Sequence, residues 1–282
     1  MGRVIYSMFM NIPADQEDVC VGHRWSWNSD HAIRLRRGHQ SYAASCGATY
    51  LFFDDASPEF VTFHTEFTRK YPFLTAYEII NFFKIHLLYV LADFFDEFLY
   101  LDFDVIPFSE QSFFVSVDIH RGLCIKPQTS AAIAKVDSLG GLKELAVSGI
   151  SKRSCAAKYA NCLALAQGDP GDWPVDIFNT GVIGATGESL AALDYFGAGF
   201  GPILEQIRQL KEAVVGYNDP ATLFAYDNET ILAVLIRRKQ LAWVSLPDRF
   251  HHICKRKSRV PVNTVLVHAI HKEFQHVWDQ CS

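Results

Sequence analysis

Asp102 and Asp104 are separated by one residue and follow a strongly apolar stretch, residues 98–101. A short apolar run of this kind predicts a buried strand, and Pro107 soon stops further strand pairing. Acidic side chains at positions i and i+2 share one face of a strand, where each raises the pKa of the other. A divalent cation removes that conflict, because Mg²⁺ and Mn²⁺ prefer oxygen ligands and are often held by carboxylates together with substrate phosphates.

This pair of aspartates therefore predicts a site for a metal ion and a diphosphate. In open α/β sheets ligands bind at the carboxyl ends of the strands, and a buried charge without a partner is costly. The alternative is an ordinary turn, in which Asp102 is a capping residue and Asp104 is solvated.

The composition is that of a folded globular chain. The 282 residues are 49% hydrophobic and 20% charged, and a chain of this length buries about three quarters of its unfolded surface. The formal net charge of −5 argues against a nucleic-acid partner. Seven scattered cysteines without a Cys-x-x-Cys pair indicate reduced thiols in a cytoplasm-like compartment.

No segment of the sequence predicts insertion into a membrane. The most apolar segment, residues 79–95, is interrupted by Asn81, Lys84, His86 and Asp93, so it falls short of the roughly 18 apolar residues that a membrane helix needs. The first residues lack the cleavage pattern of a signal peptide. We therefore expect a soluble protein located in the cytoplasm.

The first part of the chain reads as alternating strands and helices. Strand formers occupy residues 3–9 and 48–53, and a helix is predicted between them, over residues 31–46. Asp54 and Asp55 follow the second strand, where carboxylates suit the ribose or base of a nucleotide. The alternative is that both residues only begin a turn.

A long buried helix is predicted from its cap, Thr75, to about Phe95, directly before the strand of the aspartate pair. Lys84 within this helix is either a cation near a phosphate or sugar, or a lysine that snorkels at the edge of the core. Residues 113–117 are rich in strand formers and predict a further strand.

Three later stretches carry more polar residues. Residues 177–184 predict a strand with a kink at Asn-Thr-Gly, where the glycine either lets the backbone approach a ligand or forms an ordinary bulge. Asp227 precedes an apolar helix that ends in basic residues, and its plain interpretation is a helix cap. A final strand, residues 264–272, delivers two histidines and a lysine at its end.

The order of these motifs resembles the metal-dependent glycosyltransferases of the GT-A fold, which use nucleotide-diphosphate sugars. The motifs are Lys84 in its apolar helix, Leu-Tyr-Leu-Asp-Phe-Asp at 99–104, Phe-Asn-Thr-Gly-Val at 178–182, Asp-Asn-Glu-Thr at 227–230 and Val-His-Ala-Ile-His-Lys at 267–272. The resemblance implies one α/β domain over residues 1–282, with a Rossmann-like, mixed and mostly parallel central sheet flanked by helices. It also implies a nucleotide-binding part at about residues 1–120 and an acceptor-side part at about residues 121–282.

By this resemblance, Mn²⁺ or Mg²⁺ bridges the diphosphate and the aspartate pair. Asp104 would be a direct metal ligand, Asp102 would bind the metal, the ribose or both, and His268 would complete the metal shell. Lys272 matches a lysine that binds phosphate. Glycogenin-like members carry His-x-x-Gly-x-x-Lys-Pro, whereas this chain lacks the glycine and the proline, so the choice between His268 and His271 stays open.

The resemblance also implies residues for the donor. Phe9, Asp54 and Asp55 match positions that frame the nucleotide base and ribose, and Lys84 and Asn179 match contacts to the donor sugar. The implied partners are a UDP-sugar donor and a glycan or glycoprotein acceptor. A chain without a membrane anchor resembles bacterial enzymes, or those of large algal viruses that glycosylate their capsid proteins. A xylosyltransferase of that viral group, using UDP-xylose in the host cytoplasm, is the most specific expectation, although no residue reads out xylose.

Inversion at the anomeric carbon needs a carboxylate that takes the proton of the acceptor hydroxyl. Asp227 is the first candidate and Glu229 the second, because a helix start keeps a carboxylate ionised. We favour inversion; in a retaining, glycogenin-like reaction the same acids would face the sugar without taking the proton. A non-catalytic carbohydrate-binding relative is the other alternative, and it predicts no metal-dependent turnover.

Overall fold

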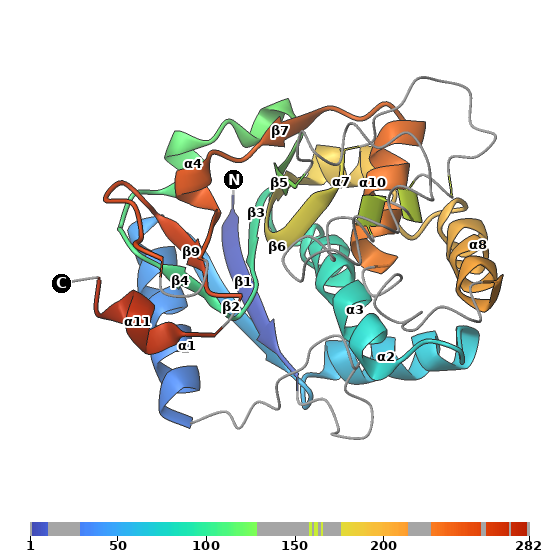
Figure 1. The fold of residues 1–282 in the computed structure, drawn as a ribbon, viewed down its shortest axis with the longest axis horizontal. Coiled ribbons are helices and arrows are strands. Elements are labelled where there is room, and N and C mark those ends of the chain that lie inside the picture. The colour runs from blue at the N-terminus through green and yellow to red at the C-terminus, as the bar shows by residue number, and fades with distance from the viewer. Residues whose placement is uncertain are drawn as a thin grey trace.

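The computed structural model describes residues 2–10, 29–128, 158–159, 161–162, 165, 176–213, 227–254, 258–270 and 272–280. Within them, a six-stranded sheet ordered β2-β1-β3-β6-β5-β7 lies beside a three-stranded sheet ordered β4-β9-β8 (Figure 1). The elements are, in chain order, β1 (Arg3–Phe9), α1 (Ser29–Ser45), β2 (Thr49–Asp54), α2 (Pro58–Lys70), α3 (Ala76–Leu91), β3 (Glu97–Leu101), β4 (Val105–Pro107), α4 (Phe113–Ser116), the 3₁₀ turn η2 (Ile119–Arg121), β5 (Leu123–Pro127), β6 (Phe178–Thr186), α7 (Gly187–Leu193), α8 (Phe200–Ala213), α10 (Asp227–Arg238), β7 (Trp243–Ser245), the 3₁₀ turn η3 (Asp248–Phe250), β8 (His252–Ile253), β9 (Leu266–His268) and α11 (Phe274–Trp278).

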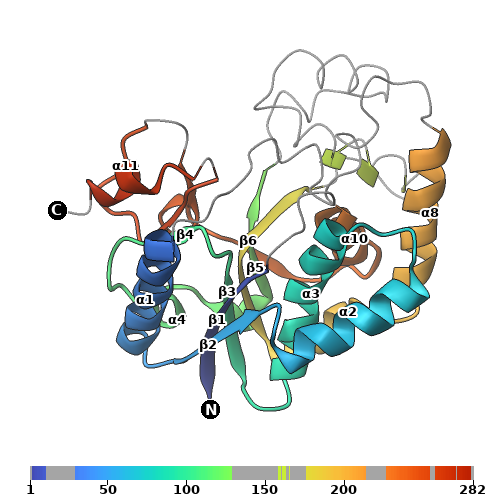
Figure 2. The same ribbon diagram turned by 90° about the horizontal axis from the view of Figure 1, so that it is seen from below.

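The large sheet is mixed and mostly parallel. Strand β1 runs parallel to β2 and β3, and β5 runs parallel to β7, whereas β6 is antiparallel to both β3 and β5. Helix α1 lies on one side of this sheet, and α2, α3, α8 and α10 lie on the other (Figure 2). The predicted α/β class, with a mostly parallel sheet between helices, is therefore confirmed. Among the helices that the structure describes, none is long and apolar enough to cross a membrane.

Strand β3 shows why the sheet is covered on both faces. All of its residues, Glu97–Leu101, are buried. Phe98 and Tyr100 pack into the core with α2, α3 and α10, whereas Leu99 and Leu101 belong to a second core. Burying each large apolar side chain contributes roughly 1.5–3 kcal/mol to stability. A strand buried on both faces reads as a continuous apolar run, which is the pattern that the sequence carries before the aspartate pair.

Helix α3 begins directly after its predicted cap, Thr75. The hydroxyl of Thr75 accepts a hydrogen bond from the amide of Glu78 at 3.2 Å, and the carboxylate of Glu78 accepts from the amide of Thr75 at 2.7 Å. This reciprocal arrangement satisfies two backbone donors that the helix leaves open. Lys84 lies on the buried part of the helix, which ends at Leu91 and leads into β3.

Residues 113–117 do not form the predicted strand. They form one helical turn, α4, in which Phe113 and Phe114 are buried. The ring of Phe113 lies against Gly184 of β6, where an added Cβ would stand 2.7 Å from the Cζ atom of that ring. Burial of the two rings outweighs the strand preference of these residues, because strand propensity depends on context and is overridden by packing.

Candidate metal centre

Asp102 and Asp104 lie in the turn between β3 and β4, and neighbouring strands hold the backbone of this turn. The amide of Asp102 donates to the carbonyl of Gly181 in β6 at 2.7 Å, and the carbonyl of Asp104 accepts from the amide of Ala269 at 3.0 Å. The pairing of β4 with β9 places His268 opposite the residue that follows Asp104. Segments far apart in the sequence therefore meet at the end of β3.

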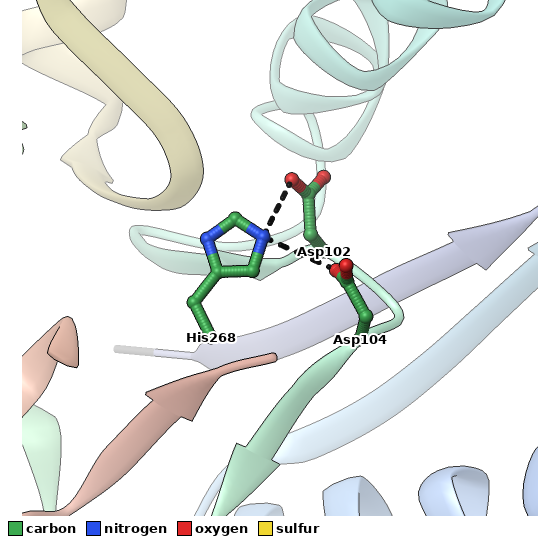
Figure 3. A group of neighbouring side chains, drawn as sticks. All are labelled: Asp102, Asp104 and His268. Carbon is green, nitrogen blue, oxygen red and sulfur yellow. Dashed lines mark ion pairs between the residues drawn. The ribbon is translucent and has the colours of Figure 1, made fainter. Parts of the chain in front are cut away.

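Figure 3 shows the side chains of Asp102, Asp104 and His268 turned toward one another. His268 Nε2 lies 3.2 Å from Asp104 Oδ1 and 3.8 Å from Asp102 Oδ2. One ligand atom from each residue lies within 4.8 Å of the others, so one metal ion could be held between them. Asp104 and His268 are buried and Asp102 is partly exposed, so the group is accessible from the side of Asp102.

Each carboxylate directs one oxygen at the imidazole and places the other in contact with the protein. Asp102 Oδ1 accepts a hydrogen bond from the hydroxyl of Tyr100 at 2.5 Å, and Lys84 Nζ lies 3.6 Å from the same oxygen. Asp104 Oδ2 forms an ion pair with Lys272. The oxygens that face the imidazole are Asp102 Oδ2 and Asp104 Oδ1, so each aspartate could supply one ligand atom.

Burial and the neighbouring side chains act in opposite directions on the pKa of Asp104. Burial raises the pKa of this carboxyl, but Lys272 and His268 outweigh that effect, so the pKa of Asp104 lies well below its usual range. Asp104 is therefore ionised at neutral pH. Burial, reinforced by the charge of Asp102, raises the pKa of the Tyr100 hydroxyl well above its ordinary value, so this phenol keeps its proton and donates it to Asp102.

Lys84 is only 4% exposed, so it is not a lysine that snorkels at the core edge. Its carbonyl accepts a hydrogen bond from the hydroxyl of Tyr6 at 2.7 Å, and its ammonium faces Asp102. Helix α3 therefore brings the buried amino group of Lys84 to the aspartate pair.

The imidazole of His268 has two close neighbours besides the carboxylates. Gly181 leaves no room for a side chain, because an added Cβ would stand 2.3 Å from His268 Cε1 and 2.9 Å from Asn179 Oδ1. His251 Nε2 lies 3.0 Å from His268 Nδ1. Burial, and then the charges of His268 and Lys126, lower the pKa of His251 well below its ordinary value, so His251 is neutral.

This donor set fits a divalent cation. The carboxylates supply hard oxygen ligands, and the imidazole supplies a nitrogen ligand. A histidine that binds a metal through one ring nitrogen usually makes a hydrogen bond with the other, and Nδ1 of His268 makes that contact with His251. Asp102, Asp104 and His268 could therefore hold the ion.

The residues predicted to frame a nucleotide lie at the ends of β1 and β2. Phe9 and Asp54 are paired in register, and the ring of Phe9 lies 5.4 Å from that of Phe103, the residue between the two aspartates. Asp54 Oδ1 accepts hydrogen bonds from the amide two residues on at 3.1 Å and from the hydroxyl of Ser57 at 3.2 Å, while Asp55 is exposed. The predicted turn is therefore present, close to the aspartate pair, and a role in binding a nucleotide stays a prediction.

Asn179 and Gly181 lie in β6 at the predicted kink, although the strand continues from Phe178 to Thr186. Asn179 Oδ1 accepts a hydrogen bond from the amide of Gly181 at 2.9 Å. The missing side chain of Gly181 gives room to the imidazole of His268. Asn179 is thus placed beside the candidate metal ligands.

Asp227 and Glu229 open helix α10, and both are buried. Glu229 Oε1 accepts hydrogen bonds from the amide of Thr180 at 2.7 Å and from its hydroxyl at 3.0 Å, and Glu229 also forms an ion pair with Lys158. Burial raises the pKa of Glu229, but Lys158, Lys84 and the contact with Thr180 outweigh it, so this pKa lies below its ordinary value. These contacts attach the start of α10 to β6, one residue before Gly181.

Sequence reasoning missed two partners of this group. Tyr100 could have been predicted, because it lies two positions before Asp102 at the end of a strand. The alternation of side chains in a strand places both residues on one face. His251 could not have been predicted, because it is 17 positions from His268 in the sequence and no local pattern links the two residues. His271, the other candidate ligand, lies outside the described residues.

No protein-family model matches this sequence, and no curated protein matches it. Solved structures with similar overall shape include a glycosyltransferase involved in the glycosylation of the major capsid of PBCV-1, which is 11% identical with a TM-score of 0.46, over 99% of this chain and 98% of that one. Mouse xyloside xylosyltransferase 1 is 10% identical with a TM-score of 0.47, over 95% of this chain and 98% of that one. The galactosyltransferase LgtC, in complex with donor and acceptor sugar analogues, is 14% identical with a TM-score of 0.38, over 94% of this chain and 86% of that one. Similarity at this distance assigns no activity.

Proposed function

We propose that this chain is a glycosyltransferase that depends on a divalent metal and moves a sugar from a nucleotide-diphosphate donor to a hydroxyl group of a glycan or glycoprotein. The observation that carries the proposal is the convergence of Asp102, Asp104 and His268 at the end of β3, with Lys84 and Lys272 beside the two carboxylates. Carboxylates with an imidazole suit a cation, and the lysines suit anionic oxygens, which is the combination that a metal-bound diphosphate requires.

Asp102, Asp104 and His268 would hold the metal, each through one atom. When bound, a divalent cation offsets the negative charge that builds on a departing diphosphate. The imidazole of His268 favours Mn²⁺ over Mg²⁺, because nitrogen ligands suit transition metals better.

Lys84 and Lys272 supply positive charge for the diphosphate of the donor. Lys272 pairs with Asp104 and keeps 29% of its side chain exposed, so part of this side chain is accessible to a donor. Its backbone has a φ of +61°, a conformation that costs a residue with a side chain about 1–3 kcal/mol and persists where the surrounding contacts require it. Both lysines would stabilise the charge of the leaving group from fixed positions.

The remaining residues that we assign to the donor lie at the ends of β1 and β2 and in β6, near the turn that carries the aspartate pair. Phe9 and Asp54 are register neighbours beside Phe103, so we assign them, with Asp55, to the nucleotide base and ribose. Asn179 lies beside the imidazole of the candidate centre and is assigned to the donor sugar.

Asp227 is the first candidate for the base that takes the proton of the acceptor hydroxyl, and Glu229 is the second. A carboxylate with a lowered pKa is a weaker base, and Glu229 is held by Thr180 and Lys158, which favours Asp227. Proton transfer to Asp227 fits inversion at the anomeric carbon. A retaining reaction is the alternative, and the anomeric configuration of the product, read by NMR, distinguishes the two.

Turnover of a donor panel tests this proposal. Purified protein is incubated with Mn²⁺ and UDP-xylose, UDP-glucose, UDP-galactose or UDP-N-acetylglucosamine, and release of UDP is measured with and without a chelator. UDP-xylose is the donor that we place first. We expect release from at least one donor, lost when the metal is removed.

The variant Asp104→Asn should lower this turnover about 10³-fold or more, because several kcal/mol of charge stabilisation depend on the metal. Asp93→Asn is the matched control, because Asp93 is an exposed acid outside the site. Full turnover in Asp104→Asn would remove Asp104 from the mechanism. Binding of a donor without hydrolysis or transfer would instead indicate a carbohydrate-binding protein.

A further inference from the structure

His251 stands behind the candidate ligand His268 and is itself fully buried, with 0% of its surface exposed. Its Nε2 atom lies 3.0 Å from His268 Nδ1, at hydrogen-bond distance. The two rings have centroids 5.3 Å apart and are inclined by only 24°. The contact therefore fixes both the position and the rotation of the His268 ring.

The small sheet places this pair together. Strands β8 and β9 run parallel, with Ile253 in register with His268, and the amide of Cys254 donates to the carbonyl of His268 at 3.0 Å. His251 directly precedes β8, so its backbone is tied to the strand that carries His268. Gly181 supplies the remaining wall of the ring, because its missing Cβ leaves the space that His268 occupies.

The hydrogen bond also decides which nitrogen of His268 can face a cation. Nε2 is directed at the carboxylates, 3.2 Å from Asp104 Oδ1. A nitrogen that binds a metal carries no proton, so the proton of a neutral His268 must then be on Nδ1. In that state Nδ1–H of His268 would donate to Nε2 of His251, which would act as the acceptor.

We infer that His251 is a positioning residue, which holds the imidazole of His268 with Nε2 toward Asp102 and Asp104 and thereby sets the affinity of the centre for a divalent cation. This inference rests on the proposed function, because it assumes that the three residues bind a metal. Neighbours that orient a metal-binding histidine in this way typically change metal affinity 10–100-fold. His251 is fully buried behind His268, so it acts through that residue.

Titration of the purified protein with Mn²⁺ alone, followed by calorimetry or by the electron paramagnetic resonance signal of free Mn²⁺, tests this role. His251→Phe keeps a flat ring but has no acceptor, and we expect the affinity for Mn²⁺ to fall about 10–100-fold. His251→Gln places an amide near the position of Nε2, and we expect it to recover most of the affinity. His252→Phe is the matched control, because it removes the neighbouring imidazole and keeps the contact between His251 and His268.

The outcomes separate this inference from the proposed function. Wild-type protein that binds no Mn²⁺ would contradict the metal centre itself. If the wild type and His251→Phe bind Mn²⁺ with equal affinity, the role of His251 is overturned. The proposed function is not affected by that result. Equal losses in His251→Phe and His251→Gln would also overturn it, because a general packing defect would then explain both.

A measurement on the wild-type chain keeps the test independent of whether His251→Phe folds. Zn²⁺ is diamagnetic and accepts imidazole ligands, so long-range ¹⁵N–¹H spectra of the histidines can be recorded with it. We expect His268 to show a protonated Nδ1 and a metal-bound Nε2 in the loaded protein. A protonated Nε2, or binding through Nδ1, would contradict the inference.

Discussion

Two pairs of acidic residues in this chain have the same spacing but lie in different secondary structure. Asp102 and Asp104 lie in a turn between strands, whereas Asp227 and Glu229 lie in the first turn of α10. In the turn both carboxylates point at one imidazole. In a helix, side chains two positions apart do not face each other.

The surroundings of the two pairs follow from this difference. In the turn, Lys84 and Lys272 lie beside one oxygen of each carboxylate. The other oxygen of each carboxylate is directed at the imidazole, where a cation could be held. In the helix pair, Glu229 is bound to Lys158 and Thr180, so its charge is compensated inside the protein. The comparison teaches that a spacing of two predicts a metal centre only when the backbone is not helical.

The largest effect on stability is expected from Glu229→Gln. The substitution breaks the buried ion pair between Glu229 and Lys158 and costs about 3–5 kcal/mol of unfolding free energy. Unfolding in urea measures this loss. Affinity for Mn²⁺ should fall less than for a change in a ligand itself, because Glu229 is linked to the aspartate pair through Lys84 and is not one of the candidate ligands. A strong loss of Mn²⁺ affinity without a loss of stability would break the comparison.

A smaller effect is expected from Gly181→Ala. The new Cβ would stand 2.3 Å from His268 Cε1, so the ring must leave the position that directs Nε2 at the carboxylates. We expect the affinity for Mn²⁺ to fall about 10–100-fold, as for other changes that misplace a ligand. Gly187→Ala is the control, because an added Cβ there meets nothing within 4 Å. Equal affinity in the two variants would show that the imidazole is not held by this wall.

The smallest effect concerns His39, which contacts the carbonyl of Val105 at 2.5 Å beneath the turn of the first pair. Burial lowers the pKa of His39 to about 4, although Val105 and Asp104 oppose this effect. Between the ordinary pKa of about 6.5 and pH 4, the unfolded chain binds a proton that the folded chain does not bind. The contribution of His39 to the unfolding free energy is therefore fully present above pH 6.5 and is lost as the pH falls toward 4.

Urea unfolding at two pH values measures this contribution. From pH 6 to pH 5 the unfolding free energy should fall by about 1 kcal/mol more in the wild type than in His39→Gln. Parallel pH profiles of the two proteins would show that His39 is protonated in the folded state.

The main elements of the fold were predictable because their signals are local. Strand β1 is rich in strand formers, the strand before the aspartate pair carries a continuous apolar run, and Thr75 is a good helix cap. Residues 113–117 were predicted wrongly, because two rings that pack against β6 decide their conformation. Local pattern identifies a strand former, whereas the final conformation depends on distant packing.

The candidate site was predictable as a set of residue types and not as a set of contacts. The sequence pointed to Asp102, Asp104 and His268, and the structure brings their side chains together. It did not point to Lys158 as the partner of Glu229, because that ion pair joins residues far apart in the chain. The same holds for His251, whose partner becomes a neighbour only when β8 and β9 pair.

The central claim is that a cation is held by Asp102, Asp104 and His268 together with the diphosphate of a nucleotide sugar. Crystals grown with Mn²⁺ and UDP, measured at the manganese absorption edge, test it most directly. We expect one anomalous peak within coordinating distance of the two aspartates, the imidazole and the diphosphate. A peak at another site, or UDP bound without manganese while these side chains point into solvent, would contradict it.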